Sequence, residues 1–496
     1  MAAALPSLPS DLLAARSLAV FPRSPVEHDG AVYGLASAAG VLRLLVAGPD
    51  GAAAGFEVAE RAGSGRFVLH VCPVHHANAE RLRAVLPGAA PSPLASRDAT
   101  FGTGDRLGLA GPGHLAVFRR FAASPVLAQQ SLRELTLTSR TYEEVLDAST
   151  WAVFREGWRD AWGADGDHLK SEEWVRRALA IGYTMITADV SDFIHGEWAV
   201  KSDAEALAQW QTLDAGVRRG LEERYLRSSF PVDTGEAVRF TPAELARTAL
   251  VYGEAVDHAA RLHRACVAQM GEGRFDFELS IDETATPTTP QAHVFMARES
   301  SRQGVAISSL APRFVGEFQK GIDYLGDVRE FERSFAVHAA LCRSLGHRIS
   351  VHSGSDKFSV FPAIGRLSRG RFHVKTAGTS WLEALRVVAA ADPALFRDLY
   401  AHARRTYDNA RKLYHVTPEL SRLPDPAGLP AAAAAALLDD RDARQVLHIT
   451  YGEMLAVPAL KRRLFDLLAG SADAYAAALE RHIGRHLAAL GVPSRS

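Results

Sequence analysis

Cysteine is scarce in this chain: only Cys72, Cys266 and Cys342 occur among 496 residues. These three lie far apart and are odd in number, so they form neither a CxxC zinc or redox motif nor a disulfide framework. Low cysteine usage of this kind is typical of a reducing compartment. We therefore expect a cytoplasmic protein.

An excess of one charge is also missing. The chain has 56 basic and 57 acidic residues, which gives a net charge of −1. Without a basic surplus a nucleic-acid partner is not expected. No apolar run is long enough to cross a membrane, and the N-terminus lacks the basic start and long apolar segment of a signal peptide. We therefore expect neither a membrane partner nor a secretory signal.

No glycine-rich nucleotide motif stands out. Residues 102–108 (GTGDRLG) resemble a GxGxxG turn only superficially. A doubly wound open sheet, which usually carries such a turn after an early strand, is therefore the second choice of fold.

The first 95 residues have the pattern of a small, separate α+β domain. Strand-like runs alternate with turns, residues 77–85 have a helical pattern, and residues 87–93 (PGAAPSP) are a plausible linker. The strand-like runs are 31–34, 41–46, 55–58 and 66–71.

From residue 98 to about 455 the pattern changes to strand followed by helix, about eight times. This alternation predicts a parallel sheet, and its number of units favours a TIM-type (β/α)8 barrel. The expected strands are 100–109, 135–138, 162–168, 183–189, 275–281, 305–310, 348–352 and 372–375. The longer expected helices are 171–181, 204–226, 241–270, 327–345 and 380–391. Residues 456–496 are rich in Ala and Leu and are expected to form a C-terminal helical extension.

Polar and charged groups gather at the ends of the expected strands, where the active sites of barrel enzymes lie. In chain order they are Asp105, Arg106; Asp165, Asp167, His168, Lys170; Asp189, Asp192; Glu278, Ser280, Asp282, Glu283; Arg313, Glu317, Gln319, Lys320; His352, Ser353, Asp356, Lys357; His373, Lys375, Thr376.

Two imidazoles and a carboxylate among these groups have the donor types of a divalent metal site with an open face. We expect His168, Glu317 and His352 to be the ligands. Two of them have a structural alternative: His168 as a buried histidine satisfied by its neighbours, and Glu317 as a salt-bridge partner of Arg313 or Lys320. For His352 the polar, glycine-containing loop that follows favours a functional role.

Several cations at the same strand ends suit an anionic substrate, and a carboxylate is favoured slightly because no phosphate-binding loop is evident. The substrate-binding candidates are Lys170, Arg313, Gln319, Lys357 and Lys375.

Five segments, in order, resemble the tagaturonate/fructuronate epimerases. They are 164–170 (ADGDHLK), 277–283 (FELSIDE), 310–323 (LAPRFVGEFQKGID), 350–357 (SVHSGSDK) and 373–378 (HVKTAG). The resemblance runs from about residue 98 to 455 and implies a barrel, a divalent metal and a sugar-acid substrate. It implies interconversion of D-tagaturonate and D-fructuronate, which differ in configuration at C4.

The resemblance places the metal near His168, and we expect Asp167 and Glu278 to be the proton-transferring pair. Asp165 could replace Asp167, and Asp282 could replace Glu278. The sequence does not distinguish Mn, Zn, Co, Ni, Fe and Mg. Because the hydrogen on C4 is not α to the C2 ketone, we expect retro-aldol cleavage of C3–C4 and re-formation of that bond, rather than simple proton abstraction.

Two other classes of function remain open from the sequence. One is a metal-dependent aldolase or ketose isomerase acting on a sugar acid on the same barrel. The other is a non-catalytic sugar-acid-binding protein. The apolar C-terminal helices could pack against a second copy of the chain, which would make a homo-oligomer.

Overall fold

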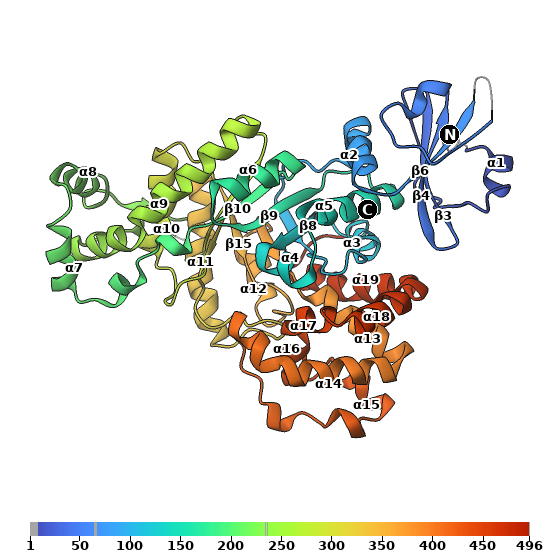
Figure 1. The fold of residues 1–496 in the computed structure, drawn as a ribbon. Helices are drawn as coiled ribbons and strands as arrows, with labels where there is room; N and C mark the ends of the chain where they lie inside the picture. Colours follow the sequence, from blue (N-terminus) through green and yellow to red (C-terminus); the bar gives the residue numbers. More distant parts are fainter. Residues whose placement is uncertain (1–7, 64–66, 234, 236, 496) are drawn as a thin grey trace.

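A computed structural model describes residues 8–63, 67–233, 235 and 237–495. At its centre eight parallel strands close into a barrel, in the order β10-β13-β14-β15-β16-β7-β8-β9 (Figure 1). The predicted (β/α)8 barrel is therefore confirmed, and the open-sheet alternative is not. The strands are β7 (Ala99–Gly102), β8 (Ser124–Ser131), β9 (Gly163–Leu169), β10 (Met185–Asp189), β13 (Asp276–Ile281), β14 (Ser309–Pro312), β15 (Arg348–Val351) and β16 (Phe372–Lys375).

Each barrel strand is followed by a helix that covers the barrel from outside. These helices are α3 (Gly111–Phe118), α4 (Leu132–Thr138) with α5 (Tyr142–Arg155), α6 (Glu172–Ile181), α9 (Pro242–Met270), α10 (Pro290–Arg302), α11 (Val328–Leu345), α12 (Phe361–Leu367) and α13 (Thr379–Ala391). Apolar strand and helix faces fill the space between the two layers, with Phe101, Phe277 and Phe335 fully buried. Burial of such side chains drives the closure of the barrel.

The second barrel strand lies elsewhere than predicted. Residues 135–138 belong to helix α4, whose N-cap is Ser131, because the Ser131 side chain accepts a hydrogen bond from the amide of Glu134. The strand is instead β8, which ends at that same serine. The predicted helix 204–226 is also divided in two, α7 (Asp203–Trp210) and α8 (Ala215–Tyr225).

The N-terminal part forms an antiparallel sheet of its own, flanked by α1 (Ser10–Ala14) and α2 (His76–Val85). Its strands are β1 (Ala19–Val20), β2 (Val26–His28), β3 (Ala31–Ala38), β4 (Val41–Gly48), β5 (Glu60–Ala62) and β6 (Val68–Pro73). The run 55–58, predicted as a strand, is irregular, and Arg66 of another predicted run lies outside the described residues. Trp151 and Phe154 of α5 pack against the core of this sheet.

Between β10 and α9 the chain makes an excursion through α7, α8 and the short hairpin of β11 (Phe230–Pro231) and β12 (Ala237–Val238). It projects from the barrel on the side away from the N-terminal sheet (Figure 1). None of the helices in the described ranges has the length and apolar character needed to cross a membrane.

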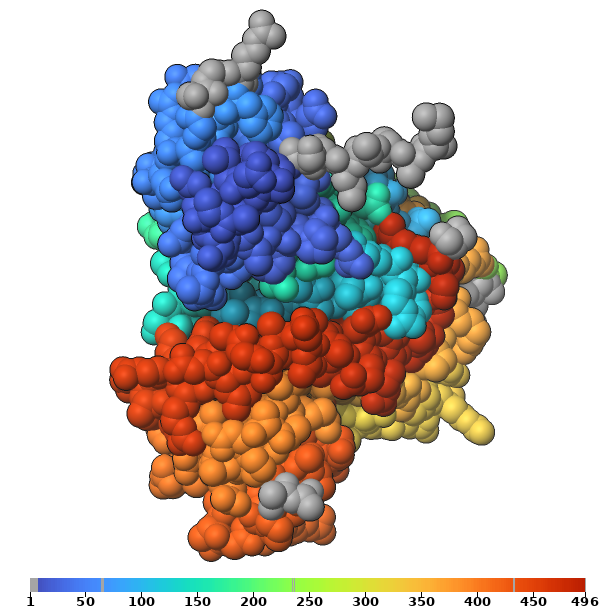
Figure 2. Space-filling model, turned by 90° about the vertical axis from the view of Figure 1, so that its right-hand side faces the viewer, coloured from blue at the N-terminus to red at the C-terminus, as the bar shows by residue number. Residues whose placement is uncertain are grey.

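The C-terminal helices are α14 (Pro393–Ala410), α15 (Ala431–Ala436), α16 (Arg441–Ile449), α17 (Tyr451–Leu455), α18 (Pro458–Gly470) and α19 (Ala472–Ala489). They share one apolar core with α13. Figure 2 shows α18 and α19 as a red band between the α3 region and the orange helices before them. The segment between α14 and α17 reaches back to the carboxyl ends of the barrel strands, where Tyr414 and His448 line a cavity.

Candidate active site

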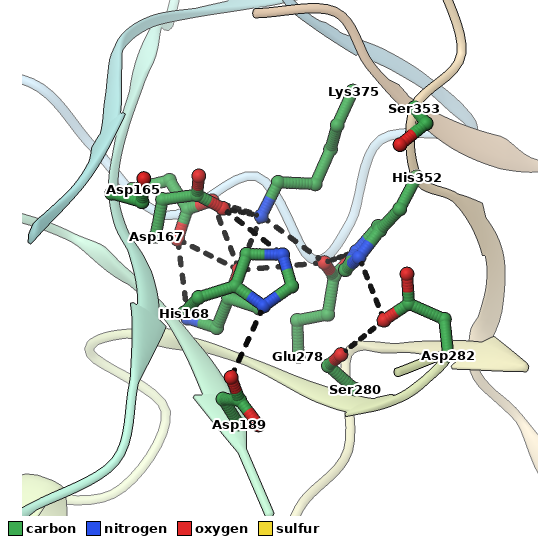
Figure 3. Close-up of polar contacts among 12 residues, drawn as sticks. Asp165, Asp167, His168, Asp189, Glu278, Ser280, Asp282, His352, Ser353 and Lys375 are labelled. Atoms are coloured by element: carbon green, nitrogen blue, oxygen red, sulfur yellow. Dashed lines mark hydrogen bonds and ion pairs between the residues drawn. The ribbon is translucent and has the colours of Figure 1, made fainter. Parts of the chain in front are cut away.

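A polar cavity lies at the carboxyl ends of the barrel strands, the end where barrel enzymes carry out their chemistry. Five of the polar groups that line it are Asp167, His168, Asp282, His352 and Lys375, which come from β9, β16 and the ends of β13 and β15 (Figure 3). Three further cations line the cavity: Arg106, Arg133 and Lys320.

A bulge in β9 places two adjacent side chains at this cavity. Gly166 pairs with Ile186 and Leu169 with Ala188, so Asp167 and His168 together stand opposite one residue of β10. His168 has a φ of 55°, in the left-handed region. A bulge bends a strand and redirects side chains, which explains how two consecutive residues both line the cavity.

His168, Asp282 and His352 offer ligand atoms that all lie within 4.8 Å of one another. The two imidazole rings are 4.9 Å apart between centroids and nearly perpendicular. Nδ1 of His352 lies 3.1 Å from Asp282, and Nδ1 of His168 lies 3.6 Å from Asp189. Two imidazoles and a carboxylate are a common donor set for a catalytic divalent metal. These residues therefore fit the metal that the sequence implies.

Glu278 lies beneath this group rather than in the cavity wall. It is fully buried, and its Oε1 lies 2.7 Å from Nε2 of His352, while its Oε2 accepts a hydrogen bond from Ser309. Since a carboxylate can only accept here, Nε2 of His352 carries a proton and Nδ1 faces Asp282 at 3.1 Å. Metal-binding histidines are usually oriented by such a carboxylate.

The acidic surroundings attract positive charge to His352. Burial alone would lower the pKa of this imidazole, but Asp282 and Glu278 outweigh burial and raise it to about 10. The carboxylates that stabilise a protonated His352 would equally stabilise a bound metal cation.

Lys375 lies at the centre of three buried carboxylates. Its ammonium contacts Asp167 and lies 2.7 Å from Asp165 and 3.5 Å from Glu278 (Figure 3). Burial raises the pKa of Asp165 to about 6. For Asp167, Lys375 and His168 outweigh burial and lower the pKa to about 2. Of these carboxylates Asp167 lines the cavity, which makes it the one available to a substrate.

The structure does not bring Glu317, the expected third ligand, to the two histidines. Its half-exposed carboxylate contacts Gln319 and lies 3.2 Å from Nε2 of His415. The reason is that β14 ends at Pro312, and the backbone of Glu317 pairs with Leu325 in a loop beyond it. Asp282, directly after β13, lies beside the two histidines instead.

Of the five substrate-binding candidates only Lys375 lines the cavity, and it is already ion-paired. Lys170 is bound to Asp192 at 2.6 Å, and its ammonium lies 3.9 Å from Asp189. Lys357 is fully buried and donates to the backbone carbonyls of Gln319, Ile322 and Ser355. Gln319 accepts from Thr417 and Gln445, and the backbone amide of Arg313 is bound by Thr288.

Of the three further cations in the cavity wall, Arg106 and Lys320 were identified near strand ends from the sequence, but Arg133 was not. Arg106 is buried, bonded to Glu134 at 2.8 Å and stacked on Tyr451. Arg133 donates to the carbonyl of Leu413. Lys320 donates to the hydroxyl of Ser353 at 2.8 Å, and no carboxylate of the described residues lies within 4.0 Å of its ammonium. Burial and the nearby Arg133 lower the pKa of Lys320.

Comparisons with known proteins agree with one another. The family model described as tagaturonate epimerase matches residues 23–490. The tagaturonate/fructuronate epimerase of Thermotoga maritima is 38% identical over 476 residues, covering 95% of this chain and 97% of that protein. Crystal structures of the fructuronate-tagaturonate epimerase from Cohnella laeviribosi, native and with one glycerol, superpose with a TM-score of 0.92 at 42% identity, covering 97% of this chain and 98% of theirs.

Proposed function

The chain belongs to the tagaturonate epimerase family, and we propose that it interconverts D-tagaturonate and D-fructuronate at C4 with the help of a divalent metal ion. It is an isomerase-class enzyme, and its reaction would take place in the cavity at the carboxyl ends of the barrel strands. The observation that carries the proposal is the placement of His168, Asp282 and His352 beside the Asp167–Lys375 pair.

His168, Asp282 and His352 would hold the metal. A divalent cation there supplies Lewis-acid polarisation of substrate oxygens. Two further carboxylates orient the imidazoles: Glu278 through Nε2 of His352, and Asp189, whose Oδ2 lies 3.6 Å from Nδ1 of His168.

Asp167 is the group that takes the proton from the C4 hydroxyl. Once that hydroxyl is deprotonated, the C3–C4 bond can break, with its electrons passing towards the C2 carbonyl. The aldehyde fragment turns over and the bond re-forms on its other face, after which the proton returns from Asp167. Lys375 holds the Asp167 carboxylate in place and keeps it ionised.

Lys320 would bind the substrate's C6 carboxylate, with Arg133 adding to the positive field. The ammonium of Lys320 already donates to Ser353 and has protons left for a carboxylate. Holding the carboxylate keeps the cleaved aldehyde fragment in the cavity while it turns.

The three cysteines are free and buried. This supports the proposal that the enzyme works in a reducing, cytoplasmic compartment.

The epimerase proposal is tested by supplying each ketohexuronate separately and following both sugars by NMR. Either substrate should give the same equilibrium mixture. Removal of metal with a chelator should abolish turnover, and a divalent cation should restore it. Release of three-carbon products as the main outcome would instead indicate an aldolase, and turnover indifferent to the chelator would exclude the metal.

The cleavage step is tested with substrate that carries deuterium at C4. Retro-aldol chemistry leaves the C4–H bond intact, so we expect complete retention of the label and no primary isotope effect. A primary isotope effect at C4, with no aldehyde ever trapped, would indicate hydride transfer instead.

A further inference from the structure

A second group of metal-ligating side chains lies outside the cavity, among α10, α11 and the residue before β15. It contains His293, His338, Cys342 and His347, which are at most 2% exposed. The Nε2 atoms of His293 and His347 are 3.1 Å apart, and Sγ of Cys342 lies 3.8 Å from the same Nε2 of His293. The proposed epimerisation uses none of these groups.

Hydrogen bonds fix the proton on His293. Nε2 of His338 lies 3.0 Å from the carbonyl of Thr288, and a carbonyl can only accept, so this nitrogen carries the proton. Nδ1 of a neutral His338 is then an acceptor. It lies 2.9 Å from Nδ1 of His293, which must therefore donate. This leaves Nε2 of His293 without a proton.

The other end of the group adds two further ligand atoms. Nε2 of His347 faces the unprotonated Nε2 of His293 at 3.1 Å, and the ligand atoms of His293, Cys342 and His347 all lie within 4.8 Å of one another. A contact this short between two ring nitrogens needs one positive centre between them, either a shared proton or a cation.

We propose that His293 Nε2, His347 Nε2 and Cys342 Sγ bind a zinc-class transition-metal ion. Tetrahedral coordination with typical zinc bond lengths separates two nitrogens by roughly 3.4 Å and a nitrogen from a sulfur by roughly 3.6 Å. The observed 3.1 and 3.8 Å are each within about 0.3 Å of these values. A metal ion would take the place of a shared proton between the two nitrogens, and the bond from His293 to His338 is the outer hydrogen bond that metal-binding histidines normally make.

This ion would have a structural role. The three ligands join α10, the last turn of α11 and the residue that enters β15, at the end of the strand opposite to the catalytic cavity. That end of a barrel serves stability rather than catalysis. His347 also lines a surface cleft beside Arg298 and Val305, and we take this cleft as the route by which the ion would enter.

Cobalt substitution tests the site in the full-length protein. A thiolate bound to Co²⁺ gives a strong charge-transfer band in the near ultraviolet, and the His168–Asp282–His352 group has no sulfur to produce one. We expect metal-free wild-type protein to develop this band on addition of Co²⁺. Cys342→Ser should lose the band and one bound equivalent of metal per chain, because a serine hydroxyl does not replace a thiolate.

The matched control is the double variant Cys72→Ser/Cys266→Ser, which removes the other two buried cysteines and should keep the band. The proposal is overturned if wild type gives no band, if the band survives in Cys342→Ser, or if the double variant loses it. Should Cys342→Ser fail to fold, wild type and the double variant still decide, since Cys342 is then the only thiol left. None of these measurements depends on epimerase activity, so their outcome is independent of whether the proposed epimerase function is correct.

Discussion

Nε2 of His352 lies 2.7 Å from Oε1 of Glu278, and both side chains are buried below the cavity. This contact gives Glu278 a different role from the one expected for it as half of a proton-transferring pair. Its oxygens are committed to His352, Ser309 and Lys375. We interpret Glu278 as a positioning residue that acts through His352.

Glu278→Gln should therefore weaken metal binding. An amide is a poorer acceptor than a carboxylate, so we expect the metal affinity to fall about 10- to 100-fold, with activity recovering at high metal concentration. Competition with a metal-sensitive dye measures this. Glu283→Gln, at the exposed rim of the same cavity, is the control and should keep wild-type affinity. Unchanged affinity in Glu278→Gln would exclude the positioning role.

Asp282→Asn and Glu317→Gln form a matched pair that identifies the carboxylate ligand. Asp282→Asn should lose one equivalent of bound metal per chain, since an amide oxygen is a much weaker ligand than a carboxylate. Glu317→Gln should retain the metal, because the Glu317 carboxylate contacts Gln319 and His415 rather than the two histidines. Metal content after gel filtration measures both. The reverse pattern would restore Glu317 as ligand.

Asp167→Asn should reduce kcat by about 10²- to 10⁴-fold, the usual contribution of a general base, while leaving metal content and substrate KM nearly unchanged. Asp192→Asn, which removes only the surface partner of Lys170, is the control for loss of a carboxylate nearby. A near wild-type kcat in Asp167→Asn would mean that a group other than Asp167 accepts the proton.

Lys320→Met should raise KM, because it removes a hydrogen bond between charged groups worth about 1.5–3 kcal/mol. This corresponds to a loss in kcat/KM of roughly 10- to 150-fold. Lys170→Met, a candidate from the sequence that the structure places against Asp192, should change kcat/KM little. Steady-state kinetics with both sugars distinguishes the two lysines, and an inverted order would make Lys170 the carboxylate ligand.

Stability below pH 4 should depend on Asp356, which is buried between His482 at 3.1 Å and Arg444 at 2.9 Å. Burial opposes ionisation of this carboxyl, but the two cations hold its pKa well below the usual value of about 3.9. Since the unfolded chain then binds the proton more readily, the stabilisation is complete above about pH 4 and is lost as the pH falls further.

Urea unfolding at a series of pH values checks this prediction. Asp356→Asn should be less stable at pH 7 by about 3–5 kcal/mol, since it leaves Arg444 buried without its counter-charge. Its stability should also fall less between pH 4 and pH 2 than that of wild type. Parallel pH profiles for the two proteins would contradict the assignment.

The barrel could be predicted from the alternation of strand and helix, but one strand could not. Strand β8 carries Gln129 and Gln130 inside it, fully buried, and begins next to a proline. These residues hide the apolar pattern of a central strand. Residues 135–138 (LTLT) alternate apolar and polar side chains as a half-buried strand does, but the cap formed by Ser131 starts a helix there.

At the site, the meeting of the two histidines and Asp167 in one cavity could be predicted because they lie at strand ends. The carboxylate beside the histidines could not: the sequence pointed to Glu317, whereas the structure brings Asp282 there, since sequence distance from a strand does not say which way a loop runs. Tyr414 and His448 reach the cavity from more than 35 residues beyond the last barrel strand. No local pattern marks a contact of that range.

The cavity wall made by Tyr414 and His448 also bears on how the enzyme is made. Synthesis proceeds from the N-terminus, and domains tend to fold as they emerge. All eight barrel strands, with the residues that would hold the metal, leave the ribosome before these two side chains do. A nascent chain can therefore assemble the ligands while the cavity above them is still open to solvent and to incoming ions, and it becomes enclosed only when the last helices arrive.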